Sequence, residues 1–256
     1  MSYWPKIIFA SFYALIHSVL AFLPLSASDH LQLISSLFPP SLHSVSLDFI
    51  IHLGTFLSLL FYCKDKWQSV ERQGVYLILG TSFVFAICLR PFISLYGKGY
   101  NDLSHSFMIM GGAYLVIEKW QWKKDLRPRR KSFLIGVATS MAIFPGVSYL
   151  GTSVLIKRIL GTGRKKAIES SLCLICPILV METVGKLFEY GTAAMVTPRE
   201  YVDPFFFLVL VPGFLLSFFS GRLDGHLQLQ PPVPLFSPVM ILLHLTVMLV
   251  HLLTEK

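Results

Sequence analysis

The chain has 256 residues, of which 54% are hydrophobic and only 14% are charged, whereas soluble domains carry ~25% charged residues. This composition excludes an ordinary soluble domain and predicts a polytopic membrane protein. The formal net charge of +8 comes from basic residues in short blocks between apolar segments, a pattern that is typical of membrane loops and argues against nucleic-acid binding.

Apolar windows close to the ~20 residues that cross a bilayer follow one another along the chain. They cover residues 7–28, 47–63, 74–96, 103–118, 132–156, 167–190, 204–221 and 235–253. All four cysteines fall in apolar surroundings. Cys173 and Cys176 have the spacing of a redox or zinc motif but lack its usual context, so we expect them to pack within a span.

Three basic blocks, within residues 64–72, 119–131 and 157–166, set the expected topology. The positive-inside rule places all three on the cytoplasmic side, so the window 132–156 between the last two must enter and leave on the same side. This window has no Asp, Glu, Lys or Arg, but it has Pro145-Gly146 at its middle, where a continuous helix would break. We therefore predict a re-entrant hairpin folded at Pro145-Gly146.

A weak internal repeat extends this interpretation to the start of the chain. Residues 21–24 resemble residues 142–145, and a new apolar window begins 23 residues after Pro24 and after Pro145. Chance similarity is the alternative, but the topology independently needs a second hairpin, within residues 7–35, that opens to the outer face. The predicted fold is an all-α polytopic membrane protein built as an inverted repeat of residues 1–118 and 132–256. Each half is a re-entrant helix hairpin plus about three transmembrane helices, which gives about six full spans with both termini outside.

Polar side chains gather at both breaks, which we expect to meet near the membrane midplane. Broken backbone at this depth survives only where protein or a water-filled cavity satisfies it, and ionisable groups within spans are candidates for function. Hydroxyl and amide donors at helix breaks suit an anionic, phosphate-bearing ligand. The candidates are His17, Ser26, Ser28, Asp29 and His30 at the first break, Gly146, Ser148, Thr152 and Ser153 at the second, and Asp48 and His52 between them. For His17, simple packing in an apolar stretch is the alternative.

Three stretches carry most of these residues: Pro24-Leu-Ser-Ala-Ser-Asp-His30, Asp48-Phe-Ile-Ile-His-Leu-Gly-Thr55 and Pro145-Gly-Val-Ser-Tyr-Leu-Gly-Thr-Ser153. In order and spacing they resemble the signature regions of the bacterial undecaprenyl-diphosphatase (bacitracin-resistance) family. The resemblance implies hydrolysis of a polyprenyl diphosphate to the monophosphate, which recycles the lipid carrier of peptidoglycan synthesis. It also implies a multi-pass protein of the bacterial inner (plasma) membrane, with an inverted repeat and re-entrant helices.

The chain departs from the family's pattern at residues that would hold metal and phosphate. The family's E-x-x-x-E pair, thought to hold a divalent cation, is replaced by His17 and Ala21, and the arginine of the third signature is replaced by Tyr149. Tyrosine cannot supply the charged, bidentate contact that arginine makes with phosphate. Where the family has glycine, Asp29 adds a carboxylate next to His30.

Two functional classes follow. In the enzyme interpretation, His30 is the nucleophile or general acid/base, and Asp29 and Ser148 complete the catalytic set. Mg²⁺ or Ca²⁺ would then be held with the help of His17 and Asp48. In the alternative, the chain is a catalytically inactive homologue that binds or translocates a polyprenyl phosphate. A structural subunit without a ligand would leave the buried polar residues unexplained. In either functional class the substrate-binding residues are expected to be Ser26, Ser28, Gly146, Thr152, Ser153 and His52.

Overall fold

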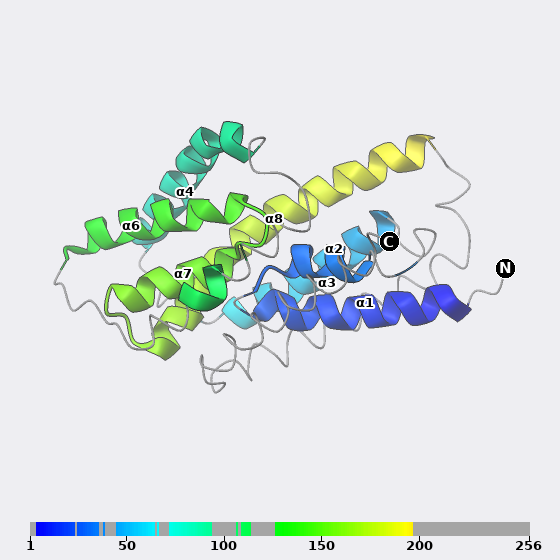
Figure 1. The fold of residues 1–256 in the computed structure, drawn as a ribbon, viewed down its shortest axis with the longest axis horizontal. Helices are drawn as coiled ribbons and strands as arrows, with labels where there is room; N and C mark the ends of the chain where they lie inside the picture. The colour runs from blue at the N-terminus through cyan, green and yellow to red at the C-terminus, as the bar shows by residue number, and fades with distance from the viewer. Residues whose placement is uncertain are drawn as a thin grey trace.

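The computed structural model describes residues 4–23, 25–35, 38, 45–64, 66, 72–93, 106, 109–113 and 126–196. Within these ranges the regular structure is helical and contains no strand, so the predicted all-α class is confirmed there (Figure 1). Of the window 103–118, the structure describes residue 106 and a short helical stretch at 109–113. The predicted windows 204–221 and 235–253 lie outside the described residues.

The first hairpin consists of helix α1 (Trp4–Phe22) and helix α2 (Ala27–Ser35). α1 ends shortly before Pro24, a residue without the N–H that a helix requires. Asp29 lies in the first turn of α2, where a negative charge interacts favourably with the helix dipole. The buried residues of α1 recur at helical spacing and pack against α3 (Val45–Cys63), chiefly on Leu47 and Ile51.

The second hairpin consists of helix α6 (Pro128–Ser140), a single 3₁₀ turn (Met141–Ile143) and helix α7 (Tyr149–Ile159). The backbone break predicted at Pro145-Gly146 is confirmed. Gly146 has φ of 81°, in the left-handed region that residues with a side chain rarely adopt. Ser148 caps α7, because its hydroxyl oxygen accepts a hydrogen bond from the Gly151 N–H at 3.1 Å.

Two long helices frame the hairpins: α4 (Arg72–Ile93) packs against α6, and α8 (Arg164–Val196) packs against α3 and α7. In Figure 1 the α1/α2 hairpin opens toward one end of the molecule and the α6/α7 hairpin toward the other, so that their tips face each other in the middle. Among the described helices, the stretch Arg164–Thr192 alone is both long and apolar enough to cross a membrane.

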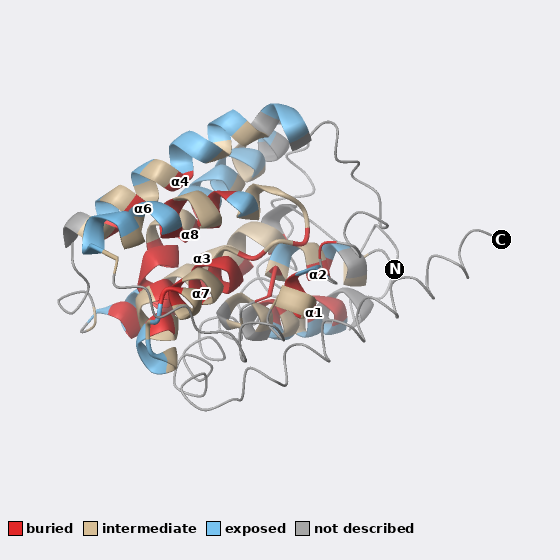
Figure 2. Cartoon of the chain, turned by 60° about the vertical axis from the view of Figure 1, so that its left-hand side comes forward, coloured by how far each residue is buried: buried red, intermediate tan, exposed pale blue. Residues whose placement is uncertain are grey.

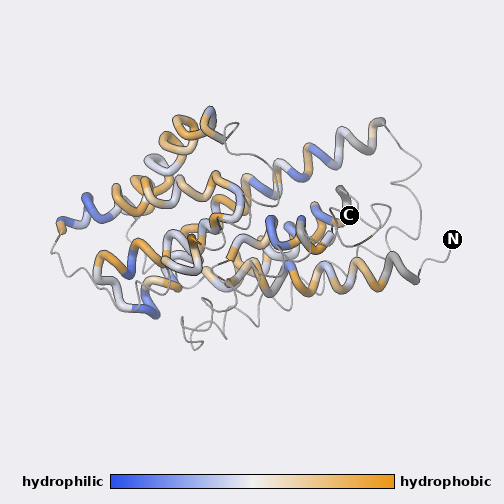
Figure 3. Tube along the Cα trace, in the orientation of Figure 1, coloured by the Kyte–Doolittle hydropathy of each residue, from blue (hydrophilic) through white to orange (hydrophobic). Residues whose placement is uncertain are grey.

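The core lies where α3, α7 and α8 meet, and Figure 2 shows buried residues concentrated along these helices. Cys173 and Cys176 are buried there as free thiols, as the sequence predicts. Apolar residues also cover the outer faces of α4 and α8, including Phe83 and Phe188, and the hydropathy trace in Figure 3 shows apolar stretches along α4. An apolar outer surface is expected where lipid surrounds the helices.

Candidate functional site

The tips of the two hairpins touch. The backbone N–H of Gly146 donates a hydrogen bond to Asp29 Oδ2 across 2.7 Å, although the two residues are 117 positions apart. The Ser26 hydroxyl donates to the same carboxylate oxygen. The expectation that the two helix breaks meet is therefore confirmed, and the Asp29 carboxylate is the group that joins them.

We predict that Asp29→Ala destabilises the fold. A hydrogen bond to a charged group contributes ~1.5–3 kcal/mol, and the variant leaves the Gly146 N–H without its acceptor. The melting temperature of the purified protein in detergent should decrease clearly. Ser28→Ala is the matched control, because Ser28 is exposed on the same turn of α2. Equal melting temperatures for the two variants would show that the Asp29 contact does not hold the hairpins together.

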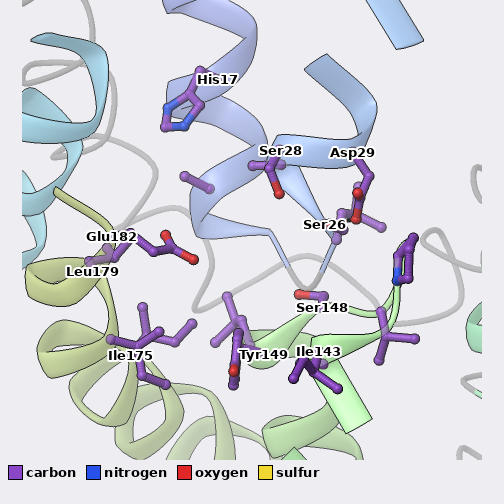
Figure 4. Close-up of a pocket in the computed structure, with 18 of the residues that line it drawn as sticks. His17, Ser26, Ser28, Asp29, Ile143, Ser148, Tyr149, Ile175, Leu179 and Glu182 are labelled. Carbon is purple, nitrogen blue, oxygen red and sulfur yellow. Dashed lines mark hydrogen bonds between the residues drawn. The ribbon is translucent and has the colours of Figure 1, made fainter. Parts of the chain in front are cut away.

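A cavity of about 300 Å³ lies beside this contact. Figure 4 shows side chains from both hairpins around it, with Glu182 of α8 directed inward from the side. α2 and α7 both begin at this cavity, so the partial positive charges of two helix N-termini converge on it. Its polar lining consists of His17, Ser26, Ser28, Asp29, His52, Ser148, Tyr149 and Glu182.

Two histidines from neighbouring helices form one wall of the cavity. The ring centroids of His17 on α1 and His52 on α3 lie 4.7 Å apart, edge to face. The Thr55 hydroxyl donates to the Ile51 carbonyl at 3.0 Å and lies 3.2 Å from His17 Nδ1. Because a hydroxyl has a single proton, His17 Nδ1 is the donor to Thr55, which leaves the lone pair on His17 Nε2.

His30 lies directly behind the cavity. Its side chain is 3% exposed, and its Nδ1 is hydrogen-bonded to the Ser26 carbonyl within the first break. The cavity lining includes the preceding residue, Asp29, but not His30 itself. His30 therefore supports the wall that Ser26 and Asp29 form.

The comparisons with known proteins identify the family. The family described as bacitracin resistance protein BacA matches residues 10–226. The chain belongs to the BacA family. An undecaprenyl-diphosphatase of Leptospira interrogans (strain Fiocruz L1-130) is 29% identical to it over 237 residues, covering 80% of this chain and 82% of that protein. An undecaprenyl-diphosphatase of Leptospira borgpetersenii is 27% identical over 256 residues, covering 85% of this chain and 86% of that protein. An undecaprenyl-diphosphatase of Protochlamydia amoebophila is 29% identical over 224 residues, covering 83% of this chain and 84% of that protein. The resemblance inferred from the signature regions is thus confirmed.

The third BacA-family signature is only partly directed at the cavity. Ser148 and the next residue, Tyr149, both line it. Gly146 uses its N–H for the contact with Asp29. Thr152 donates from Oγ1 to the Ser148 carbonyl at 2.8 Å, and Ser153 Oγ lies 2.8 Å from Ser171 Oγ of α8. The Thr152 hydroxyl is thus engaged within α7, and the Ser153 hydroxyl at the contact between α7 and α8.

The two predicted metal ligands make different contacts. His17 contacts His52, whereas Asp48 accepts a hydrogen bond from Tyr13 at 3.2 Å and lies 3.9 Å from the Lys186 ammonium. Within the described residues, no group of three or more His, Cys, Asp or Glu side chains could hold a metal ion. Mg²⁺ and Ca²⁺ prefer at least six oxygen ligands, which these side chains do not provide. Binding of either cation stays a prediction.

The sequence analysis missed Glu182, which lines the cavity from α8. It lies far along the chain from all three signature stretches, so motif matching did not find it. A signal was nevertheless present, because Glu182 is a carboxylate inside the apolar window 167–190. Such residues are costly within a membrane and for that reason are candidates for function.

Proposed function

We propose that this chain is an undecaprenyl-diphosphate phosphatase, which hydrolyses undecaprenyl diphosphate to undecaprenyl phosphate and inorganic phosphate. The observation that carries the proposal is the joining of two BacA-family signature regions around one polar cavity. Relatives named undecaprenyl-diphosphatase that cover 80% or more of the chain support it. The reaction would recycle the lipid carrier of peptidoglycan synthesis.

Recognition of the phosphate groups is assigned to hydroxyls and helix N-termini. Ser148 Oγ accepts from the Gly151 N–H, so its own proton is available for a phosphate oxygen. Ser28 is exposed at the start of α2, and the N-termini of α2 and α7 favour an anion between them. Tyr149, beside Ser148, has a phenolic hydroxyl as a further neutral donor.

Proton donation to the leaving oxygen is assigned to Asp29, which lines the cavity, and to His30 directly behind it, with Ser148 holding the terminal phosphate. In the proposed reaction, a water oxygen bonds to the terminal phosphorus while the bond from that phosphorus to the bridging oxygen breaks. The electron pair of the broken bond leaves with undecaprenyl phosphate, and the proton lost by the water ends on the released phosphate. A positioned acid/base group typically contributes 10²–10⁴-fold to such a reaction.

Phosphate release from undecaprenyl diphosphate by the purified protein, with and without Mg²⁺ or Ca²⁺, tests the proposal. We expect equal amounts of phosphate and undecaprenyl phosphate, and a markedly lower rate for Ser148→Ala. Thr192→Ala is the matched control, because its hydroxyl bonds only to the α8 backbone outside the cavity and the rate should not change. Binding of the lipid without any release of phosphate would contradict the proposal.

A second candidate function is that of a catalytically inactive homologue that binds or translocates a polyprenyl phosphate. It is favoured by one observation: among the described residues that line the cavity, none is lysine or arginine. Such a site would hold the lipid phosphate through neutral donors and would lack the charge that stabilises the transition state. Retention of undecaprenyl phosphate without turnover of the diphosphate would be its signature.

For the membrane arrangement, we propose a multi-pass protein of the bacterial inner membrane with about six full spans and both termini outside. The halves of the inverted repeat would be residues 1–118 and 132–256, and both hairpins would be re-entrant. Support comes from the opposite directions in which the α1/α2 and α6/α7 hairpins open (Figure 1). Support also comes from the basic residues at the start of α6 and at the end of α7.

This arrangement predicts that the loops at 119–131 and 157–166 lie on the same, cytoplasmic side. Arg129→Cys and Gly163→Cys, in a background without the native cysteines, should both react with a membrane-impermeant maleimide only from inside. Met195→Cys, at the other end of α8 and 84% exposed, is the control that should react from outside. Opposite labelling of the two loop cysteines would rule out a re-entrant hairpin at 132–156.

A further inference from the structure

Glu182 is a carboxylate in the cavity to which no role has yet been assigned. Its side chain is directed into the cavity (Figure 4). Within the described part of the chain it forms neither a hydrogen bond nor an ion pair. The nearby carboxylates are engaged: Asp29 with Ser26 and Gly146, and Glu189 with Lys186. Glu182 is exposed at the wall of the cavity, so its carboxylate is open to a ligand or a reacting water there.

The space that Glu182 enters lies next to Ala21. Ala21 lines the same cavity and packs against a core cluster of α3, α7 and α8 residues, to which Ile175 and Leu179 of α8 belong. Glu182 follows Leu179 by one helical turn, so it projects from the same face of α8. The small side chain of Ala21 leaves room there, and α8 supplies the carboxylate that α1 lacks at this point.

Glu182 and the phosphate donors lie on different sides of the cavity. Figure 4 shows Ser148 near the joined helix breaks and Glu182 on the α8 side. A phosphate held by the Ser148 hydroxyl and the N-termini of α2 and α7 would therefore leave space for a water between its phosphorus and Glu182. A water in that space would lie between the phosphorus and a carboxylate that can take its proton.

We propose that Glu182 is the general base of the reaction. This role rests on the proposed phosphatase function. The Glu182 carboxylate takes a proton from water as the water oxygen bonds to the terminal phosphorus. The bond between that phosphorus and the bridging oxygen breaks, and the electron pair leaves on undecaprenyl phosphate. The proton then passes from Glu182 to the released phosphate, and the carboxylate is restored.

The test compares Glu182→Gln with Glu189→Gln in phosphate release from undecaprenyl diphosphate. Glutamine preserves the shape of the side chain but cannot take the proton, so kcat should decrease at least ~10²-fold while KM changes little. Glu189 lies two turns further along the same helix and does not line the cavity, so Glu189→Gln should keep the wild-type kcat. The double variant Glu182→Gln with Ala21→Glu returns a carboxylate from the opposite wall and should recover at least ~10-fold of the lost rate.

The outcomes separate this inference from the proposed function. Wild-type hydrolysis with at least half of the rate kept in Glu182→Gln overturns the role of Glu182 and leaves the phosphatase function standing. Wild-type protein that binds the lipid but releases no phosphate overturns both. A lower kcat together with a lower melting temperature and no recovery by Ala21→Glu shows a structural role and overturns the inference. A lower kcat at an unchanged melting temperature supports it.

Discussion

Replacing His30 with alanine is expected to lower the rate of phosphate release at least ~10²-fold, the effect typical of losing a general acid or base. The imidazole is buried directly behind the cavity, and its Nδ1 is hydrogen-bonded to the carbonyl of Ser26. The substitution therefore removes both a group that transfers protons and a support of the first helix break. Phosphate release measured at saturating lipid gives this effect on kcat.

His30→Asn separates these two contributions. The asparagine amide can still donate to the Ser26 carbonyl, but it cannot carry a proton between reacting groups. If His30 takes part in proton transfer, asparagine should be as damaging as alanine. A rate within about threefold of wild type would mean that His30 only positions Ser26. Wild-type hydrolysis that is unaffected by His30→Ala would move the chemistry away from the first helix break.

The backbone of the site could be predicted from the sequence because proline and glycine determine local geometry. Pro24 and Pro145-Gly146 interrupt apolar windows, and the structure breaks the helices at both places. Helix bounds were predicted less closely. α8 extends over residues 164–196 rather than 167–190, and at its start the helix continues into the basic residues at which the apolar window ends.

The orientation of side chains around the second break could not be predicted from their proximity in sequence. Ser148 caps α7 at the cavity, but a helix rises 1.5 Å per residue, so four residues further on the chain has climbed ~6 Å. At this distance the Thr152 hydroxyl donates a hydrogen bond to the Ser148 carbonyl, and the Ser153 hydroxyl contacts that of Ser171 on α8. In the same way, Asp48 lies one turn before His52 on α3, and only His52 reaches the cavity.

Contacts between distant residues account for the rest of what the sequence analysis missed. The hydrogen bond from Gly146 to Asp29 joins residues 117 positions apart, and Glu182 comes to the cavity on a helix that carries no signature stretch. Neither follows from local spacing, since both depend on how α8 and the two hairpins pack. The sequence shows that Glu182 lies in an apolar window, but it does not show that the side chain projects into the cavity.

Restoring the family's residues at three positions is expected to raise phosphatase activity. His17, Ala21 and Tyr149 all line the cavity, so the variant His17→Glu, Ala21→Glu, Tyr149→Arg places two carboxylates and one guanidinium around the same space. A charge-assisted contact to phosphate contributes ~1.5–3 kcal/mol, which corresponds to a rate increase of about 10- to 150-fold if it is made in the transition state. The carboxylate pair should make this activity depend on Mg²⁺ or Ca²⁺.

If this prediction is right, the charge of the three new side chains, rather than their size, causes the increase in phosphatase activity. A matched variant with glutamine at all three positions has side chains of similar size without their charge, and it should show no increase and no cation dependence. Phosphate release and lipid binding are measured for both variants with and without each cation. A triple variant that keeps the wild-type melting temperature but neither binds nor hydrolyses undecaprenyl diphosphate would contradict the placement of the substrate in this cavity, because the added groups would then face the same space without meeting a phosphate.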